Sequence, residues 1–401
     1  MTKNTPLQFT AIVAVVSLIF IVFALTLVRQ KSKTSAESST QPSLKTVEQP
    51  NPFFPEQNGS YPNLGIPSVQ LSPNKVTSLP LPEPRLKQQQ QNLVYNVNSS
   101  PNFQYSKELK QIINQAVQLV KQEKLPVQPL SITLIDVNLH EIAGYQEHQP
   151  RYPASIVKLF WMVILYGQLQ TGYFQYGETF FNDLHKMIVE SDNEASSRII
   201  DIITDTKSGS NLNNIELKEW IKKRKYANLF FKYSGYKNIN ITQKTFPIRY
   251  LDMDEPEGRD LQMRGDPKAP VRNAITTQQS ARLMYEIMTD QAVSRQASQA
   301  MKGLLIRELK PEAWIHLNPN DGEFNPVRAF LGESLPTDIH FLSKAGWTSG
   351  SRQEVACIIT EDKKTAYILA IIADDRAYSQ NGKMFPKISR LVFERMVARR
   401  Q

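Results

Sequence analysis

The chain has 401 residues, of which 41% are hydrophobic and 21% are charged, a composition close to that of ordinary soluble proteins, which excludes a collagen-like or wholly disordered chain. The formal net charge is +9, but no long run of Lys or Arg concentrates it, so a cationic solvated surface is favoured over nucleic-acid binding. The single cysteine, Cys357, excludes an intrachain disulfide and a cysteine-cluster metal site.

The N-terminal region contains an uncharged stretch, residues 9–28, that is rich in Val, Ile, Leu and Phe. As a helix it is long enough to cross a bilayer core of about 30 Å. A cleaved signal peptide has a shorter apolar stretch and a small-residue cleavage site, whereas this one runs directly into Arg29, Lys31 and Lys33. We therefore predict an uncleaved transmembrane anchor over residues 1–30. The basic residues after it, taken alone, would keep the rest of the chain in the cytoplasm.

Residues 31–105 have the composition of a linker. Most of the prolines in the N-terminal half of the chain lie there, interleaved with Ser, Asn and Gln, and residues 88–91 are all Gln. Such a segment buries too little apolar surface to offset its conformational entropy, and its proline density favours a semi-extended spacer. We predict a disordered linker without catalytic residues.

Residues 106–401 have the alternating patterns of one compact domain. Apolar residues at helical spacing predict helices over 109–120, from Ser155 onward, and over 182–204, 276–290 and 384–399. Residues 131–137 read as a strand, and residues 354–360 and 365–372 flank a polar turn as in a hairpin. Strands at both ends with helices between them predict an α/β domain of the α+β type. It would contain an antiparallel sheet built from both ends of the domain, helices packed on that sheet, and an all-helical lobe.

Most common nucleophile and phosphate-binding motifs are absent from the sequence. It has no G-x-S-x-G elbow, no H-E-x-x-H and no G-x-x-x-x-G-K loop. The motif Ser-x-x-Lys occurs three times, at 72–75, 155–158 and 234–237. It places a hydroxyl and an amine one helical turn apart on the same face, and a partly desolvated lysine there can accept the proton of the serine.

Of the three serines, only Ser155 opens a strongly apolar helix, and it follows Pro153. N–H groups at a helix start can stabilise a developing oxyanion, and apolar surroundings exclude water. Two further short motifs follow in chain order. Ser191-Asp192-Asn193 precedes a helical stretch, and Lys344-Ala345-Gly346 precedes the terminal hairpin. Taken singly, the first motif is compatible with a helix cap and the second with a turn at a strand end.

These three motifs in this order resemble the signatures S-x-x-K, S-D-N and K-T-G of the serine β-lactamase and penicillin-binding protein superfamily. The stretch from Leu251 to Glu257, with the sequence LDMDEPE, resembles the class A β-lactamase loop that carries the deacylating glutamate. The resemblance extends from about Ser106 to the C-terminus and implies a β-lactamase/transpeptidase-like fold.

Carried over residue by residue, the resemblance implies four catalytic residues. Ser155 is the nucleophile, and Lys158 helps to deprotonate it, although the acylation base of the family is disputed between this lysine and the loop glutamate. Ser191 relays a proton to the leaving nitrogen. Glu255 activates the hydrolytic water.

The resemblance also implies substrate-binding residues. Asn193 holds the side-chain amide of the substrate, and Lys344, in a motif completed by Gly346, attracts its carboxylate. The backbone N–H groups of Ser155 and Trp347 form the oxyanion hole.

Several positions depart from the family pattern. Ala345 replaces the threonine of K-T-G, and the lost hydroxyl would cost about 1–3 kcal/mol of substrate binding unless Thr348 or Arg352 compensates. Arg259 stands where the family has a water-holding asparagine, and Gly258 replaces a leucine. The chain between Asn193 and Glu255 is also longer than in class A enzymes, which indicates an insertion around residues 222–245.

Three functions remain open on this basis. The first is a membrane-tethered, class A-like serine hydrolase that opens β-lactams, with deacylation that is slow. The second is a D-Ala-D-Ala peptidase that acts on peptidoglycan stem peptides, and the third is a non-catalytic cell-wall-binding module of the same fold. Neither a metal nor an organic cofactor is expected, and no nucleic acid. Since these substrates are met outside the cytoplasm, we predict a single-pass inner-membrane protein whose catalytic domain lies on the periplasmic side, against the bias of the flanking charges.

Overall fold

The computed structural model describes residues 93–173, 178–317 and 324–401. Its centre is a six-stranded sheet in the order β1-β3-β2-β6-β5-β4. The strands are β1 (Gln104–Tyr105), β2 (Leu130–Asp136), β3 (Glu141–Tyr145), β4 (His340–Thr348), β5 (Ser351–Ile359) and β6 (Ala366–Ala373). All neighbours are antiparallel except the short β1–β3 pair, which is parallel.

The two ends of the domain meet in this sheet. Strand β2 pairs with β6 from Leu130 opposite Ala373 to Asp136 opposite Tyr367. The predicted terminal hairpin is the β5–β6 pair, joined by the polar turn at residues 360–365. The predicted α+β fold, with its sheet assembled from both ends, is thus confirmed.

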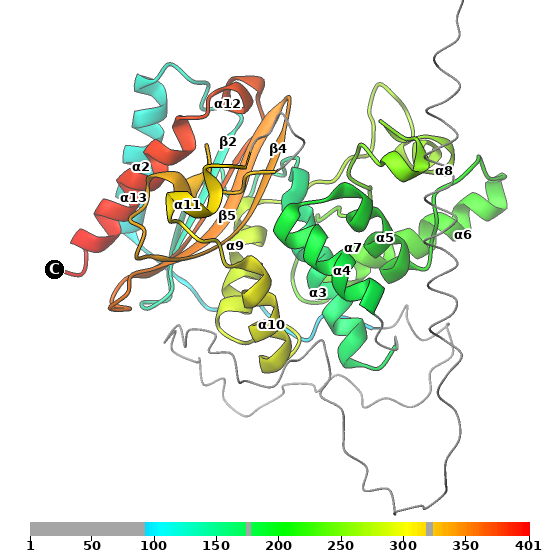
Figure 1. The fold of residues 1–401 in the computed structure, drawn as a ribbon, viewed down its shortest axis with the longest axis horizontal. Coiled ribbons are helices and arrows are strands. Elements are labelled where there is room, and N and C mark those ends of the chain that lie inside the picture. Colours follow the sequence, from blue (N-terminus) through cyan, green and yellow to red (C-terminus); the bar gives the residue numbers. More distant parts are fainter. Residues whose placement is uncertain (1–92, 174–177, 318–323) are drawn as a thin grey trace, which may run out of the picture. The chain divides into compact units, whose positions relative to one another are not determined.

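Helices cover both faces of the sheet (Figure 1). Helices α2 (Lys107–Gln122) and α13 (Met384–Ala398) pack on one face, and α9 (Thr277–Met288) packs on the other. Helix α2 buries its apolar stripe from Leu109 to Val120, the spacing that predicted it. Ser106 caps this helix by accepting a hydrogen bond from the backbone N–H of Leu109. Strands β2, β5 and β6 are buried along their whole length, and apolar clusters lie on both faces of the sheet.

A second group of helices forms the predicted helical lobe beside the sheet (Figure 1). Its members are α3 (Val157–Gln170), α4 (Glu178–His185), a π-helical turn η3 (Lys186–Glu190), α5 (Asn193–Thr204), α6 (Asn214–Arg224), α7 (Tyr226–Lys232) and α8 (Gly258–Arg264). Helix α3 is buried along almost its whole length, because apolar residues surround it on every side. The pattern over 182–204 is interrupted at Ser191 and Asp192, so it forms α4, η3 and α5 rather than one helix.

The remaining described elements are short or connect the lobe to the sheet. They are η2 (Ala154–Ile156), η4 (Arg249–Leu251), α10 (Arg295–Leu305), α11 (Pro311–Trp314), η6 (Leu331–Ser334) and α12 (Arg376–Gln380). Of these, η2 is central to the site because it leads directly into α3 and packs against β4 and β5.

Residues 93–105, which the composition assigned to the linker, pack on the domain. The backbone N–H of Tyr95 donates to the carbonyl of Phe230 at 2.8 Å. The hydroxyl of Tyr95 donates to Glu286 Oε2 at 2.9 Å, and Ser234 Oγ donates to the Tyr95 carbonyl at 3.1 Å. Ordered structure therefore begins before Ser106. The remainder of the predicted linker and the predicted anchor over residues 1–30 lie outside the described residues.

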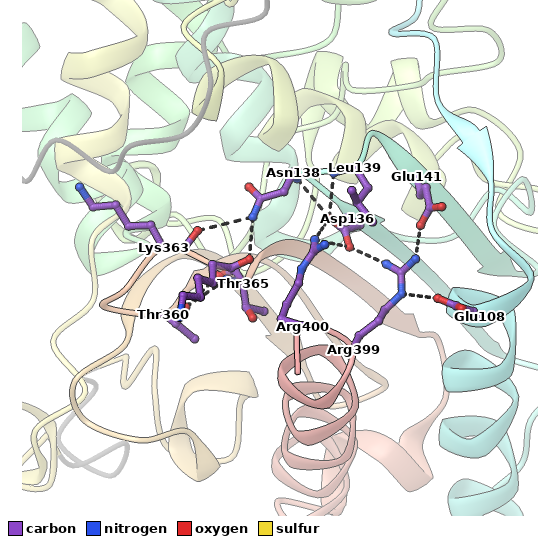
Figure 2. A network of polar contacts seen from close by, with 11 residues as sticks. Glu108, Asp136, Asn138, Leu139, Glu141, Thr360, Lys363, Thr365, Arg399 and Arg400 are labelled. Atoms are coloured by element: carbon purple, nitrogen blue, oxygen red, sulfur yellow. Dashed lines mark hydrogen bonds and ion pairs between the residues drawn. The ribbon is translucent and has the colours of Figure 1, made fainter.

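The C-terminal end of α13 is fastened to the sheet by a cluster of charges (Figure 2). Arg399 donates to Glu108 at 2.7 Å, to Asp136 at 2.5 Å and to Glu141, while Arg400 donates to both oxygens of Asp136. Asp136 is fully buried. This cluster therefore links the C-terminal end of α13 to α2 and to the β2–β3 turn.

The predicted inner-membrane location is corrected by the structure. Among the helices of residues 93–173, 178–317 and 324–401, none has the length and apolar character needed to cross a membrane. The apolar stretch on which the prediction rested, residues 9–28, lies outside the described residues.

Candidate active site

Ser155 lies in η2, at the point where the chain enters the buried helix α3. The preceding residue, Ala154, has a positive φ of 42°, a conformation that costs an alanine free energy and is frequent at functional sites. Gly346 of β4 passes directly beside this turn. A Cβ atom at position 346 would lie 2.8 Å from the backbone nitrogen of Ser155, so only glycine allows β4 to approach the serine this closely.

Lys158 points inward one turn later, and its side chain is fully buried. Three acceptors surround its Nζ: the Ser191 carbonyl at 2.5 Å, Asn193 Oδ1 at 2.9 Å and the Asp192 carbonyl at 3.3 Å. Burial lowers the pKa of Lys158 from 10.5 to about 7, against the opposing field of Asp192. A substantial fraction of this amine is therefore neutral near pH 7 and has a lone pair that can accept a proton.

Ser191 stands between the two lysines of the site. The π-helical turn η3 delivers it in a left-handed conformation with φ of 58°, and its Oγ accepts a hydrogen bond from Lys344 Nζ at 2.8 Å. Lys344 is fully buried on β4. Its pKa lies well below the usual range because of burial and the nearby charges of Lys158 and Arg307, which Glu354 partly offsets. A substrate carboxylate next to Lys344 would raise that pKa again.

Asn193 connects Lys158 to a separate loop. Asp192 caps α5 by accepting from the backbone N–H of Ala195 at 2.6 Å, so Asn193 occupies the first turn of the helix. Its Oδ1 accepts from Lys158, and its Nδ2 donates to the carbonyl of Phe246 at 2.9 Å. The structure thus brings Lys158, Ser191, Asn193 and Lys344 into one hydrogen-bonded set, in which Lys158 lies one helical turn after Ser155.

Glu255 is not part of this set. Its side chain is exposed, and no contact with Ser155 or Lys158 is found among the described residues. The loop that reaches Asn193 is instead residues 242–250, through Phe246, whose peptide bond to Pro247 is cis. The E-P-E sequence on which the prediction rested lies further along the chain, just before α8.

The two substitutions next to Glu255 have a structural reason that is unrelated to water binding. A Cβ at Gly258 would lie 1.9 Å from the Gly209 carbonyl, so the close approach of these segments requires glycine. Arg259 donates to the carbonyl of Ser210 at 3.1 Å and packs beside Gly209. Both residues therefore attach α8 to the segment before α6 rather than to Asn193.

Thr348 and Arg352, which could compensate for the threonine hydroxyl that Ala345 lacks, already make other hydrogen bonds. Arg352 donates to the carbonyls of Tyr378, Ala329 and Ser379. Thr348 Oγ1 lies 2.8 Å from Ser351 Oγ. Ala345 itself is buried in the apolar cluster on the α2 and α13 face of the sheet, so the structure offers no hydroxyl at this position.

Trp347 follows Gly346 on β4 and is about half exposed, at 52%. Its indole N–H donates to the Ser379 carbonyl at 3.1 Å. This hydrogen bond holds the indole ring against α12. The backbone of Trp347 directly follows Gly346, the residue whose backbone approaches Ser155.

Two buried charged residues whose electrostatic field acts on Lys344 have no motif in the sequence. Arg307 donates to the carbonyls of Leu304, Ile306 and Ile188, and burial lowers its pKa to about 10. Glu354 lies opposite Ala345 on β5 and accepts from the backbone N–H of Leu331 at 2.7 Å. Burial raises the pKa of Glu354 to about 7. The sequence signal for Glu354 is only a single acidic residue at the start of a predicted apolar strand.

A cavity of about 740 Å³ adjoins the hydrogen-bonded set, with Ser191, Asn193, Pro247 and Arg307 in its wall. This volume suits a small-molecule ligand. The ring of Phe324, also in the wall, has its centroid 5.6 Å from Lys344 Nζ. Across the described ranges, no three His, Cys, Asp or Glu side chains form a group that could hold a metal ion.

Comparison with protein families assigns part of the chain to a family. The model Beta-lactamase2, described as the beta-lactamase enzyme family, matches residues 181–396, which is more than half of the chain. The matched region contains Ser191, Asn193 and Lys344, and it begins after Ser155 and Lys158. A search of curated protein sequences found no match.

Solved structures share the fold at low sequence identity. The beta-lactamase from Sphaerobacter thermophilus DSM 20745 aligns with a TM-score of 0.50 and 15% identity over 72% of this chain and 98% of its own. A variant of the last common ancestor of Gram-negative bacteria beta-lactamase class A aligns with a TM-score of 0.48 and 16% identity, covering 72% and 99%. A PBP-A mutant, described as an acyl-enzyme complex with penicillin G, aligns with a TM-score of 0.49 and 16% identity, covering 73% and 98%.

Proposed function

Because the chain belongs to the beta-lactamase enzyme family, we propose that it opens β-lactam rings through an acyl-enzyme at Ser155 and releases the product slowly. The observation that carries this proposal is the arrangement of Lys158, Ser191 and Lys344 in one hydrogen-bonded set next to the serine. A lysine whose pKa is about 7 is suited to act as a base at neutral pH.

The proposed acylation step replaces the C–N bond of the lactam by a C–O bond to Ser155 and transfers three protons, from Ser155 to Lys158, from Ser191 to the leaving nitrogen and from Lys344 to Ser191. Ser155 Oγ attacks the lactam carbonyl carbon while its proton passes to the neutral Nζ of Lys158. The carbonyl oxygen becomes an oxyanion, which the backbone N–H groups of Ser155 and Trp347 stabilise. When the ring C–N bond breaks, Ser191 donates its proton to the leaving nitrogen and regains one from the lysine that holds its hydroxyl, Lys344. The product is an ester of Ser155.

The residue that contacts Asn193 supports slow deacylation. The residue of loop 242–250 that touches Asn193 is Phe246, through its carbonyl, and neither Phe246 nor Pro247 has a carboxylate that could activate a water. Glu255 is exposed and outside the hydrogen-bonded set. The general base that the resemblance assigns to Glu255 is therefore not among the groups that bond to Asn193 or Lys158, which supports slow hydrolysis of the ester.

The same observation favours a second candidate, a D-Ala-D-Ala peptidase that acts on peptidoglycan stem peptides. Such an enzyme uses the same serine and lysines for acylation, and a long-lived penicillin ester is compatible with it. The two candidates differ in turnover: the peptidase releases D-Ala from a stem peptide, whereas the slow lactamase consumes β-lactam at the rate at which its ester decays.

Intact-mass measurement with a labelled penicillin tests the proposal. We expect the mass of the full chain to rise by one penicillin and to return slowly, and Ser155→Ala to abolish the adduct. The variant Glu255→Gln should leave the adduct lifetime unchanged. A general base in use contributes about 100-fold or more, so a lifetime lengthened by that factor in Glu255→Gln would overturn the argument for slow deacylation.

A further inference from the structure

Loop 242–250, which contacts Asn193, is held by a row of polar side chains on one face of α5. Asn193, Ser197 and Asp201 are spaced four residues apart and so lie on the same face. Asn193 donates to the Phe246 carbonyl at 2.9 Å. Lys244 of the loop donates to Ser197 Oγ at 2.7 Å and to Asp201 Oδ2 at 2.6 Å. All three positions of this row therefore bind the same loop.

The last member of the row, Asp201, is shared with helix α6. Arg224, at the C-terminal end of α6, donates to Asp201 Oδ1 at 2.8 Å and lies 3.8 Å from Asp260 Oδ1 of α8. Its guanidinium also stacks on the ring of Trp220, 4.7 Å from the centroid. Two cations and two carboxylates thus form an electrically balanced cluster that joins α5, α6, α8 and the loop.

The cluster is buried, which makes each partner necessary to the others. The side chains of Arg224 and Lys244 are fully inaccessible, and Asp201 is only 14% exposed. Burial lowers the pKa of both cations and raises that of Asp201, whereas their mutual attraction opposes each of these changes. A buried charge that loses its partner is strongly unfavourable, so removing one member displaces the others.

We propose that the insertion positions the catalytic amine: Arg224 fixes Asp201, Asp201 fixes Lys244, and Lys244 holds Phe246 against Asn193, which binds Lys158. Arg224 and Lys244 are positioning residues in this scheme, because neither touches the reacting atoms. The proposal rests on the proposed function for its kinetic readout, since the rate that it controls is the acylation of Ser155.

The test compares Arg224→Met with Lys223→Met in the full chain. Lys223 is the neighbour of Arg224 on α6, but it is partly exposed and pairs only with Asp205 among the described residues, at 2.8 Å. Two quantities are measured: the rate constant and final extent of labelling by a labelled penicillin, and hydrogen–deuterium exchange of the amides of residues 242–250. The first depends on catalysis, and the second does not.

We expect Arg224→Met to lower the acylation rate constant about tenfold or more, as for a small displacement of a catalytic group, while labelling still goes to completion. Exchange in residues 242–250 should accelerate, and Lys223→Met should resemble the parent chain in both measurements. A merely structural loss would lower the extent of labelling without changing its rate constant. Parent-like labelling rate and exchange in Arg224→Met would overturn the proposal.

Two further outcomes are distinguishable. If Arg224→Met does not fold, Arg224→Lys keeps the charge with a shorter reach and is expected to give intermediate rate and exchange; parent-like values in that variant would overturn the proposal. If the parent chain is never labelled, the proposed function fails. Hydrogen–deuterium exchange of residues 242–250 in Arg224→Met then decides whether Arg224 positions this loop, because that measurement does not depend on activity.

Discussion

The acylation of Ser155 should depend steeply on pH because Lys158 can accept a proton only when it is neutral. Burial places the pKa of Lys158 at about 7 rather than 10.5. Below pH 7 most of the amine is an ammonium whose three protons are donated to the Ser191 carbonyl, the Asp192 carbonyl and Asn193. The rate constant should therefore rise with pH and level off above pH 8.

The size of the effect follows from the pKa. A pKa of about 7 leaves roughly half of the Lys158 amines neutral at pH 7 and about 1% at pH 5, which is a decrease of about 50-fold. An amine with the ordinary pKa of 10.5 would be about 0.03% neutral at pH 7 and would gain tenfold per pH unit well beyond pH 9. Burial of this lysine thus supplies about a thousandfold more reactive amine at neutral pH.

The assay is quenched-flow labelling of the full chain by a penicillin between pH 5 and pH 9, read by intact mass. The label is used at saturating concentration, so that changes in carboxylate binding by Lys344 do not enter the rate constant. Ser155→Ala provides the background. A rate constant that is flat from pH 5 to pH 9, or that still rises tenfold per unit at pH 9, would refute the role of Lys158 as the neutral base.

Three predictions concern stability. Burial raises the pKa of Glu354 from 4.5 to about 7. The free energy of unfolding of the parent should therefore fall by about 3 kcal/mol as pH rises through that interval. Glu354→Gln cannot titrate, so its free energy of unfolding should rise by that amount relative to the parent between pH 4.5 and pH 8. Arg399→Met removes one of the two arginines that pair with the buried Asp136 and leaves Arg400 and the backbone N–H groups of Asn138 and Leu139, and it should cost about 2–4 kcal/mol. Tyr95→Phe removes one of the hydroxyls that donate to Glu286 and should cost about 1–2 kcal/mol.

All three stability predictions are checked by denaturant unfolding of the parent and the variants. For Glu354→Gln the informative quantity is the difference from the parent as a function of pH, and a difference that stays constant would contradict the raised pKa. Arg390→Met is the matched control for Arg399→Met, because Arg390 lies on the same helix in an exposed pair with Glu394. Equal losses in the two arginine variants would contradict the anchoring role of Arg399.

The sequence predicted the sheet and its main helices because these depend on local apolar periodicity. Helix α2 repeats its apolar residues at helical spacing, and the β5–β6 hairpin consists of two mainly apolar runs on either side of a polar turn. The packing of Tyr95 was missed because its partners, Phe230 and Glu286, are more than a hundred residues away. A short apolar segment in a proline-rich stretch gives no local sign of such contacts.

For a similar reason, the sequence indicates only some of the residues that lie together at the site. The motifs around Ser155, Ser191 and Lys344 lie on rigid elements, whereas the position of Glu255 depends on the length of the chain before it. In the structure Phe246 of loop 242–250, rather than the E-P-E sequence, contacts Asn193. A signal for this existed in the sequence: Asn193, Ser197 and Asp201 form a polar row at helical spacing in a helix whose isoleucines 199, 200 and 203 are buried.

The central claim is that Ser155 is the nucleophile, and peptide mapping of the labelled chain tests it most directly. After reaction with a labelled penicillin, digestion and fragment-ion sequencing should locate the added mass on Ser155. An adduct on Ser191, on Ser197 beside the buried Lys244, or on any residue outside the 153–158 segment would contradict this account.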